Sequence, residues 1–215
     1  MKTHRLLFVV ISMVGLLSAC EETDNETYYS TLGNLKITAD SVIIESDKGN
    51  RMMVKNSLSS SFKDNDRVIA YFTMAEQPLP KGIDYVINVY NIEKVLVKPV
   101  IVYDSTKADS IGNDPIFVNG TWISKNYLNV DFRFYGYNLK HMINLTRNAG
   151  IFGADTIQLE IRHNDKNDAP QYTLNGFVSF DLTTIEHPEK DSVVLHVTAK
   201  EYGNKVYEKY LTYRY

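Results

Sequence analysis

Apolar and polar residues alternate over much of the chain, which is typical of strands that bury one face. The clearest run covers residues 127–135, where Asn129, Asp131 and Arg133 separate the apolar positions. Residues 157–161 and 178–182 repeat this period of two. Frequent turn signals and the scarcity of a helical period predict a C-terminal, immunoglobulin-like antiparallel β-sandwich.

The first half of the chain predicts an OB-like small barrel, so the whole chain is expected to be all-β. A handful of strand-like runs over roughly 70 residues suits such a barrel. Residues 67–74 are apolar on both faces, as expected for a strand buried in a barrel. The expected strands in this half are residues 35–38, 42–45, 51–55, 67–74, 85–92 and 95–103.

The amino terminus carries the pattern of an exported lipoprotein. Lys2 and Arg5 precede an apolar run, residues 6–17. This run is shorter than the roughly 20 residues that a spanning helix needs, and it has the length of a signal peptide. The sequence Leu-Ser-Ala-Cys then ends at Cys20, which matches a lipidation signal. An ordinary secretory peptide with a chance cysteine is the less favoured alternative.

These patterns divide the chain at changes in composition. The expected parts are a signal peptide over residues 1–19, an acidic tether over 20–29, the barrel over 30–104, a polar connection over 105–114 and the sandwich over 115–215. Two or three acyl chains on Cys20 would hold the protein at a membrane, expected to be the outer membrane. The tether is read as a solvated linker or, alternatively, as a tag for surface export.

Composition excludes several classes of protein. Cys20 is the only cysteine, so no disulfide and no catalytic or metal-binding thiol is expected. Removal of residues 1–19 takes away Lys2 and Arg5 but no acidic residue, which moves the formal charge from −3 to −5. An acidic chain argues against a nucleic-acid partner.

The C-terminal half contains segments that resemble a known family. Residues 141–145 read His-Met-Ile-Asn-Leu, residues 159–164 read Leu-Glu-Ile-Arg-His-Asn, and residues 177–182 read Phe-Val-Ser-Phe-Asp-Leu. With the lipidation signal, they resemble the NigD-like lipoproteins of gut anaerobes over essentially the whole chain. The resemblance implies an N-terminal OB-type domain and a C-terminal β-sandwich. It also implies a role in immunity to a bacteriocin-like product, and it supplies no catalytic residues.

Two histidines are the first candidate site. His141 and His163 each end an apolar face of a predicted strand. Imidazole nitrogens there could share a zinc ion, but no spacing motif supplies further ligands. The favoured prediction is therefore structural, with each histidine donating to a backbone carbonyl at a strand end. No metal and no cofactor is expected.

Three further features are weaker candidates. Asn164 begins the run Asn-Asp-Lys-Asn-Asp, which could bind calcium but is better explained as a polar hairpin loop. Trp122, with Tyr127, Tyr135 and Tyr137, could form a stacking platform for a glycan, although core packing explains most aromatic residues in β proteins. Ser105 and Ser110 follow aspartates in triplets that look like O-glycosylation acceptors.

No nucleophile with a base, metal set or phosphate loop is visible, so the chain is not expected to be an enzyme. The leading hypothesis is a non-enzymatic lipoprotein that binds a protein partner or ligand through its barrel or sandwich loops. A glycan-binding accessory protein is the alternative. A fimbrial subunit is less favoured, because no arginine lies between Cys20 and Arg51 for the usual maturation cleavage.

Overall fold

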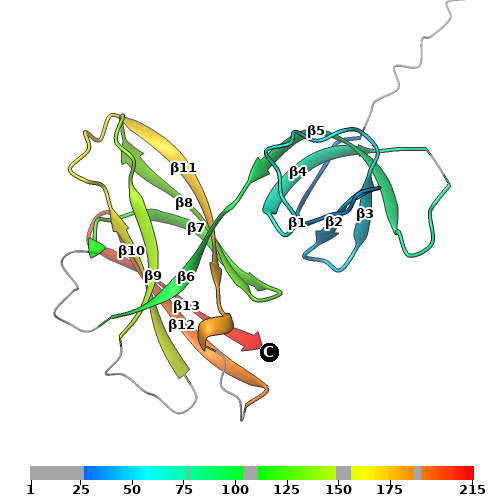
Figure 1. The fold of residues 1–215 in the computed structure, drawn as a ribbon. Coiled ribbons are helices and arrows are strands. Elements are labelled where there is room, and N and C mark those ends of the chain that lie inside the picture. The colour runs from blue at the N-terminus through cyan, green and yellow to red at the C-terminus, as the bar shows by residue number, and fades with distance from the viewer. Residues whose placement is uncertain (1–26, 77, 104–110, 149–155, 186–189) are drawn as a thin grey trace, which may run out of the picture.

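The computed structural model describes residues 27–76, 78–103, 111–148, 156–185 and 190–215. Two β domains lie side by side, and the chain passes from one to the other where β5 runs into β6 (Figure 1). The predicted all-β architecture, a barrel followed by a sandwich, is confirmed.

The N-terminal domain is a closed barrel with the strand order β1-β2-β3-β5-β4. Closure follows from the antiparallel pairing of β1 with both β2 and β4. A closed barrel has no free sheet edge, and the inward side chains of its strands form the core. Its strands are β1 (Tyr29–Ile37), β2 (Val42–Ser46), β3 (Arg51–Val54), β4 (Arg67–Met74) and β5 (Tyr85–Lys94).

The C-terminal domain is one strongly coiled sheet of eight strands, ordered β13-β12-β10-β9-β6-β11-β8-β7. Its two outer strands approach each other, since Thr121 and Tyr207 share a hydrogen bond of 2.7 Å. The sheet therefore forms a sandwich that is close to a barrel. Its strands are β6 (Leu96–Tyr103), β7 (Phe117–Ser124), β8 (Tyr127–Gly136), β9 (Met142–Asn148), β10 (Thr156–Asn164), β11 (Tyr172–Asp181), β12 (Ser192–Glu201) and β13 (Lys205–Arg214), with a short 3-10 helix at Thr183–Ile185.

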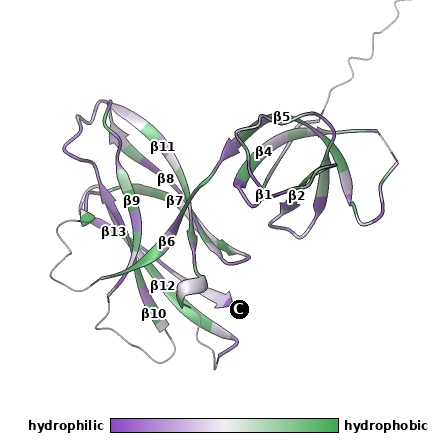
Figure 2. Cartoon of the chain, in the orientation of Figure 1, coloured by the Kyte–Doolittle hydropathy of each residue, from purple (hydrophilic) through white to green (hydrophobic). Residues whose placement is uncertain are grey.

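The alternation of apolar residues gave the correct inner face of this sheet. Leu128, Val130 and Phe132 of β8 are buried in one core, with partners from β10, β11 and β12. Green and purple alternate along these strands in Figure 2, as expected for a sheet with one apolar face. Gly203 and Asn204, both with positive φ, form the turn between β12 and β13. The dipeptide Gly-Asn between two strand-like runs predicts such a hairpin.

The sequence assigned β6 to the wrong domain. It was predicted as a barrel strand, but it pairs with β11 and β9 of the C-terminal sheet. Both pairings are parallel, as is that of β10 with β12, so the sheet is mixed and not purely antiparallel. Local alternation reports which face is buried but not which strand lies alongside, and this explains the error.

Among the described residues, no helix is long and apolar enough to cross a membrane.

Candidate binding site between the domains

A buried arginine joins the two domains. Arg67, the first residue of β4, is 2% exposed and sits where the barrel meets the sandwich. Its guanidinium donates to both carboxylate oxygens of Asp47, over 3.0 and 2.7 Å. From the sandwich, Ser179 Oγ accepts from Nε over 2.8 Å and Asn129 Oδ1 accepts from Nη2 over 2.8 Å. The ring of Tyr127 lies 4.2 Å from the guanidinium carbon.

The groups around Arg67 also bind one another. Ser124 donates to Asp47 Oδ2 over 2.5 Å, which is a second link between the domains. Asn129 donates to Ser124 Oγ, and Ser179 donates to Asn129 Oδ1, each over 2.7 Å. A buried charge is tolerated when it is paired and its remaining donors are bonded. This Arg67 cluster therefore fixes how the two domains meet.

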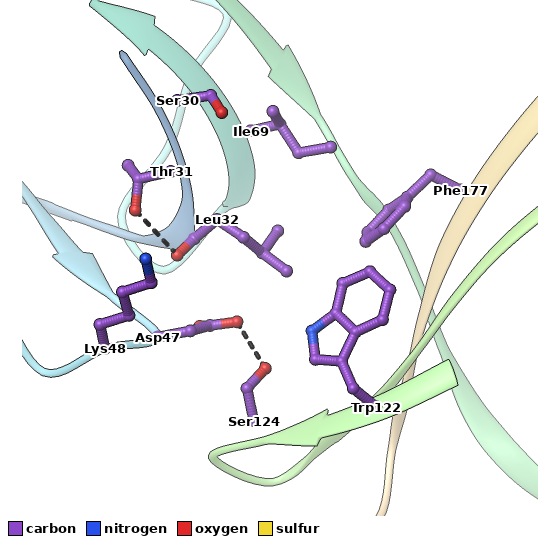
Figure 3. Close-up of a pocket in the computed structure, with 9 residues that line it drawn as sticks. All are labelled: Ser30, Thr31, Leu32, Asp47, Lys48, Ile69, Trp122, Ser124 and Phe177. Carbon is purple, nitrogen blue, oxygen red and sulfur yellow. Dashed lines mark hydrogen bonds between the residues drawn. The ribbon is translucent and has the colours of Figure 1, made fainter. Parts of the chain in front are cut away.

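A cleft of about 370 Å³ opens beside the Arg67 cluster. Figure 3 shows Leu32 and Ile69 of the barrel facing Trp122 and Phe177 of the sandwich across it. The Trp122 side chain is 39% exposed, and its ring centroid lies 5.7 Å from that of Phe177. Apolar walls with a few fixed polar groups are the usual make-up of a ligand pocket.

The four aromatic residues proposed as one glycan platform do not lie together. Trp122 lines the cleft, whereas Tyr127 is covered by Arg67. Tyr135 packs against Tyr202 with ring centroids 4.9 Å apart, and Tyr137 lies 6.0 Å from Tyr172. Only Trp122 therefore belongs to the cleft.

The two candidate histidines do meet, in the sandwich. His141 Nδ1 lies 3.0 Å from His163 Nε2, and His141 Nε2 lies 3.1 Å from Asp168 Oδ2. Because a carboxylate only accepts, the neutral arrangement has His141 donating to Asp168 and accepting from His163. His163 Nδ1 then carries a lone pair, and it is buried with no hydrogen-bond partner within the described part of the chain. We call these three residues the histidine relay.

The surroundings of the relay shift two pKa values. Asp168 accepts from the backbone N–H of Tyr137 over 2.6 Å, and this bond is the main cause that lowers the pKa of Asp168 to about 2. Burial, followed by the neighbouring His141, lowers the pKa of His163 to about 4. The relay near neutral pH is thus a carboxylate bonded to His141, with His163 neutral.

This geometry replaces the predicted bonds from the histidines to backbone carbonyls. Each histidine instead bonds to the other, and Asp168 completes the chain. The sequence marks Asp168 only as the last residue of the polar run that begins at Asn164, and local pattern does not place it beside the histidines. The three side chains form a line and do not surround one point, and no cluster of three metal-ligating side chains is found among the described residues.

The other candidates are local or lie outside the described residues. Asn164 Oδ1 accepts from the backbone N–H of Lys166 over 2.9 Å, and Asp165 does the same for Asn167, so the first four residues of this run form a polar turn, whereas Asp168 at its end belongs to the relay. Cys20, Ser105 and Ser110 lie outside the described residues. Their lipidation and glycosylation stay predictions.

The barrel, the sandwich and the cleft between them define a two-domain β protein of the class that pairs an OB domain with a β-sandwich. Residues 32–95 match the NigD-like N-terminal OB domain, and residues 99–213 match the NigD-like C-terminal β-sandwich domain. The chain therefore belongs to the NigD-like family. No curated protein matches the sequence.

Solved structures share the fold at low identity. A protein of Parabacteroides distasonis, provisionally described as toxin-related, is 22% identical with a TM-score of 0.74, and the match covers 87% of this chain and 94% of that one. A NigD-like immunity protein of Bacteroides caccae is 16% identical with a TM-score of 0.59, over 86% and 92%. A protein of Bacteroides fragilis, provisionally described as a lipoprotein, is 12% identical with a TM-score of 0.62, over 88% and 98%. These likenesses establish the fold.

Proposed function

We propose that this chain is a non-enzymatic lipoprotein of the cell envelope, anchored through Cys20, which binds a protein partner in the cleft between its domains. The observation that carries the proposal is the cleft itself. Trp122 and Phe177 face Leu32 and Ile69 across a space of about 370 Å³. Tryptophan is enriched among the few residues that carry most of the binding energy of protein interfaces.

The Arg67 cluster supports the proposal because it prepares the cleft before a partner arrives. Ser124 and Asp47 border the cleft and belong to the same bonded network as Arg67. A site that is already ordered avoids the entropy cost of ordering on binding. The cleft therefore suits recognition by fixed walls.

A role in immunity is the more specific form of this proposal. One relative with the same fold is named a NigD-like immunity protein, and another is provisionally described as toxin-related. The partner would then be a bacteriocin-like product intercepted at the envelope. An immunity protein acts by binding, which agrees with a site made of packing and hydrogen-bonding groups.

Cross-linking in intact cells tests the proposal. The full-length protein and its Trp122→Ala variant are cross-linked, purified, and compared by mass spectrometry of the proteins that accompany them. One dominant partner with the native chain, lost with Trp122→Ala, is the expected result. Tyr85→Ala is the matched control, since Tyr85 is also 39% exposed but lies on the barrel and does not line the cleft. A partner retained by Trp122→Ala would contradict binding in the cleft.

A glycan ligand is the second candidate, and the exposed Trp122 ring in the cleft favours it. Aromatic faces stack on sugar rings, and Asp47 and Lys48 lie at the same site. Affinity electrophoresis of the native chain against a panel of polysaccharides is the test. A retardation that Trp122→Ala removes would favour the glycan over the protein partner.

A further inference from the structure

The C-terminal sheet divides at β6. The first half of β6 pairs with β11, from Leu96↔Val178 to Pro99↔Asp181. Its second half pairs with β9, starting at Val100↔Leu145. Residues 172–177 of β11 and 142–144 of β9 thus extend beyond their ladders with β6, one on each side of it. We call the opening between them the seam.

The seam is a cavity of about 310 Å³ with mainly apolar walls. One wall is β11, with Asn175, Gly176 and Phe177, and the other is β9, with Met142 and Ile143. The remaining lining includes Leu96, at the start of β6, and the rings of Phe132 and Phe134. Leu96 and Met142 are 52% and 40% exposed, which is unusual for apolar residues beside a core.

Lys98 of β6 bonds to β9 beside the seam. Its ammonium donates to the carbonyl of Ile143 over 2.8 Å and also to Asn144 Oδ1. Ile143 lies just before the ladder between β9 and β6, so Lys98 supplies a donor where that ladder has not yet begun. The opening is therefore held by specific bonds and is a built feature of the sheet.

The seam and the cleft between the domains share one lining residue. Phe177 lines both cavities, so an extended segment could leave the cleft, pass Phe177 and enter the seam. Free strand edges on both sides suit the backbone of such a segment, and the apolar walls suit its alternate side chains.

Charge indicates what kind of segment fits. Apart from the two histidines of the relay, the ionisable side chains that line the two cavities are Asp47, Lys48 and Lys140. Asp47 is neutralised by Arg67. Lys48 and Lys140 are exposed and make no ion pair within the described ranges. Two unpaired cations in a chain of negative net charge favour a segment that carries carboxylates.

We propose that the seam binds an extended, acidic segment of the protein partner, which adds as a strand beside β11 and β9 and places apolar side chains against Leu96, Met142 and Phe134. This inference deepens the proposed function and rests on it. The ligand class is a peptide strand with alternating apolar residues and at least one Asp or Glu.

A displayed library of random twelve-residue peptides, selected on the full-length protein in lipid nanodiscs, tests this. Selected peptides are synthesised, and their dissociation constants are measured. We expect acidic peptides of alternating polarity whose affinity falls about tenfold or more with Leu96→Glu or Met142→Glu. Val206→Glu is the control, because Val206 is a 67% exposed apolar residue on β13, away from the seam. Both test positions are well exposed, so these variants should fold.

Backbone methylation distinguishes strand addition from simple packing. A segment paired with β11 on one side and β9 on the other directs alternate N–H groups to each strand, so a methyl group on any amide in the paired stretch should weaken binding about tenfold, while methyl groups at the unpaired ends of the peptide should not. On binding, hydrogen exchange should slow at residues 172–177 and 142–144. Equal tolerance at every amide would overturn the proposal, as would unchanged affinity of Leu96→Glu.

The outcomes separate this inference from the proposed function. Peptides that lose affinity with Trp122→Ala but not with Leu96→Glu would leave the cleft as the binding site and overturn the seam. A concentration-dependent dimer that slows exchange at the seam would assign it to a second copy of this chain, which also overturns the inference. Binding of polysaccharide with no selected peptide would overturn both proposals.

Discussion

The two buried polar clusters, the Arg67 cluster and the histidine relay, have different roles in the fold. The Arg67 cluster joins residues from both domains, with Arg67 bonded to Asp47 in the barrel and to Ser179 in the sandwich. The histidine relay lies within the sandwich, and one nitrogen of His163 stays without a partner among the described residues. A permanent cation with bonds to fixed acceptors holds a geometry, whereas a neutral imidazole responds to pH. The first cluster should therefore dominate stability, and the second should govern how stability changes with pH.

Replacement of the central cation should have the largest effect. Arg67→Met leaves the buried Asp47 carboxylate uncompensated, so we expect the free energy of unfolding to fall by about 3–5 kcal/mol. Urea denaturation followed by circular dichroism measures this loss. Arg51→Met is the control, because the Arg51 side chain is 47% exposed and its pair with Glu45 spans 3.8 Å. An Arg67→Met loss no larger than that of the control would show that the cluster does not hold the domains.

Acid should weaken the fold through His163. Its pKa is lowered from 6.5 to about 4 in the folded state, so between these values the unfolded chain binds more protons. Stability should therefore fall as the pH falls from 6.5 towards 4, by at most about 3 kcal/mol. Asp168, with a folded pKa of about 2, adds its own loss only below its unfolded value of 3.8.

Urea denaturation at several pH values, with His163→Leu, checks this assignment. The variant should lose most of the pH dependence between 6.5 and 4. His196→Gln serves as the control, since His196 lies on β12 and bonds to Glu208 outside the relay. An unchanged pH slope in His163→Leu would assign the titration to another group.

Loss of one hydrogen-bond partner of Arg67 should lower the free energy of unfolding by a moderate amount. Ser179 is fully buried, accepts from Arg67 Nε and donates to Asn129 Oδ1. Ser179→Ala removes both bonds and should lower the free energy of unfolding by about 1–2 kcal/mol. Ser59→Ala, at an exposed hydroxyl that bonds to the side chain and backbone of Ser61, should change it by less than about 0.5 kcal/mol in the same denaturation experiment. If both variants changed the free energy of unfolding equally, the hydrogen bonds of Ser179 would add nothing to stability.

Trp122→Ala should have the smallest effect on stability. Its ring is part of the cleft wall and 39% exposed, so we expect a loss below about 1 kcal/mol. The same variant should lose partner binding, which separates a binding residue from a structural one. A large loss of stability would indicate instead that Trp122 is needed to hold the domains together.

The sequence predicted which face of a strand is buried better than it predicted which strands and side chains lie beside it. The inward residues of β8 and the turn at Gly203 follow from local pattern, and both are confirmed. The role of Arg67 could not be predicted this way, because its bond to Ser179 spans 112 residues. The same limit hid the domain of β6, whose partners lie more than 40 residues further along the chain.

For the candidate sites, too, local pattern predicted positions on a strand but not the side chains that contact them. Periodicity placed His141 and His163 at the ends of apolar faces, and the fold brings them together. It did not connect them with Asp168, which ends the polar run after β10 and reaches the relay from that loop. Trp122 was grouped with three tyrosines by composition, but its real neighbour is Phe177, which lies on a strand far along the chain.

The most direct test of binding in the cleft places a photo-cross-linking amino acid at position 48 of the full-length protein in living cells, with position 206 as the control. Lys48 is exposed and lines the cleft, so this change leaves Trp122 in place. We expect one partner protein to be cross-linked at 48 and not at 206, and we expect Arg67→Met to reduce this product because the cleft loses its fixed geometry. The same products at both positions, or none at 48, would contradict binding in the cleft between the domains.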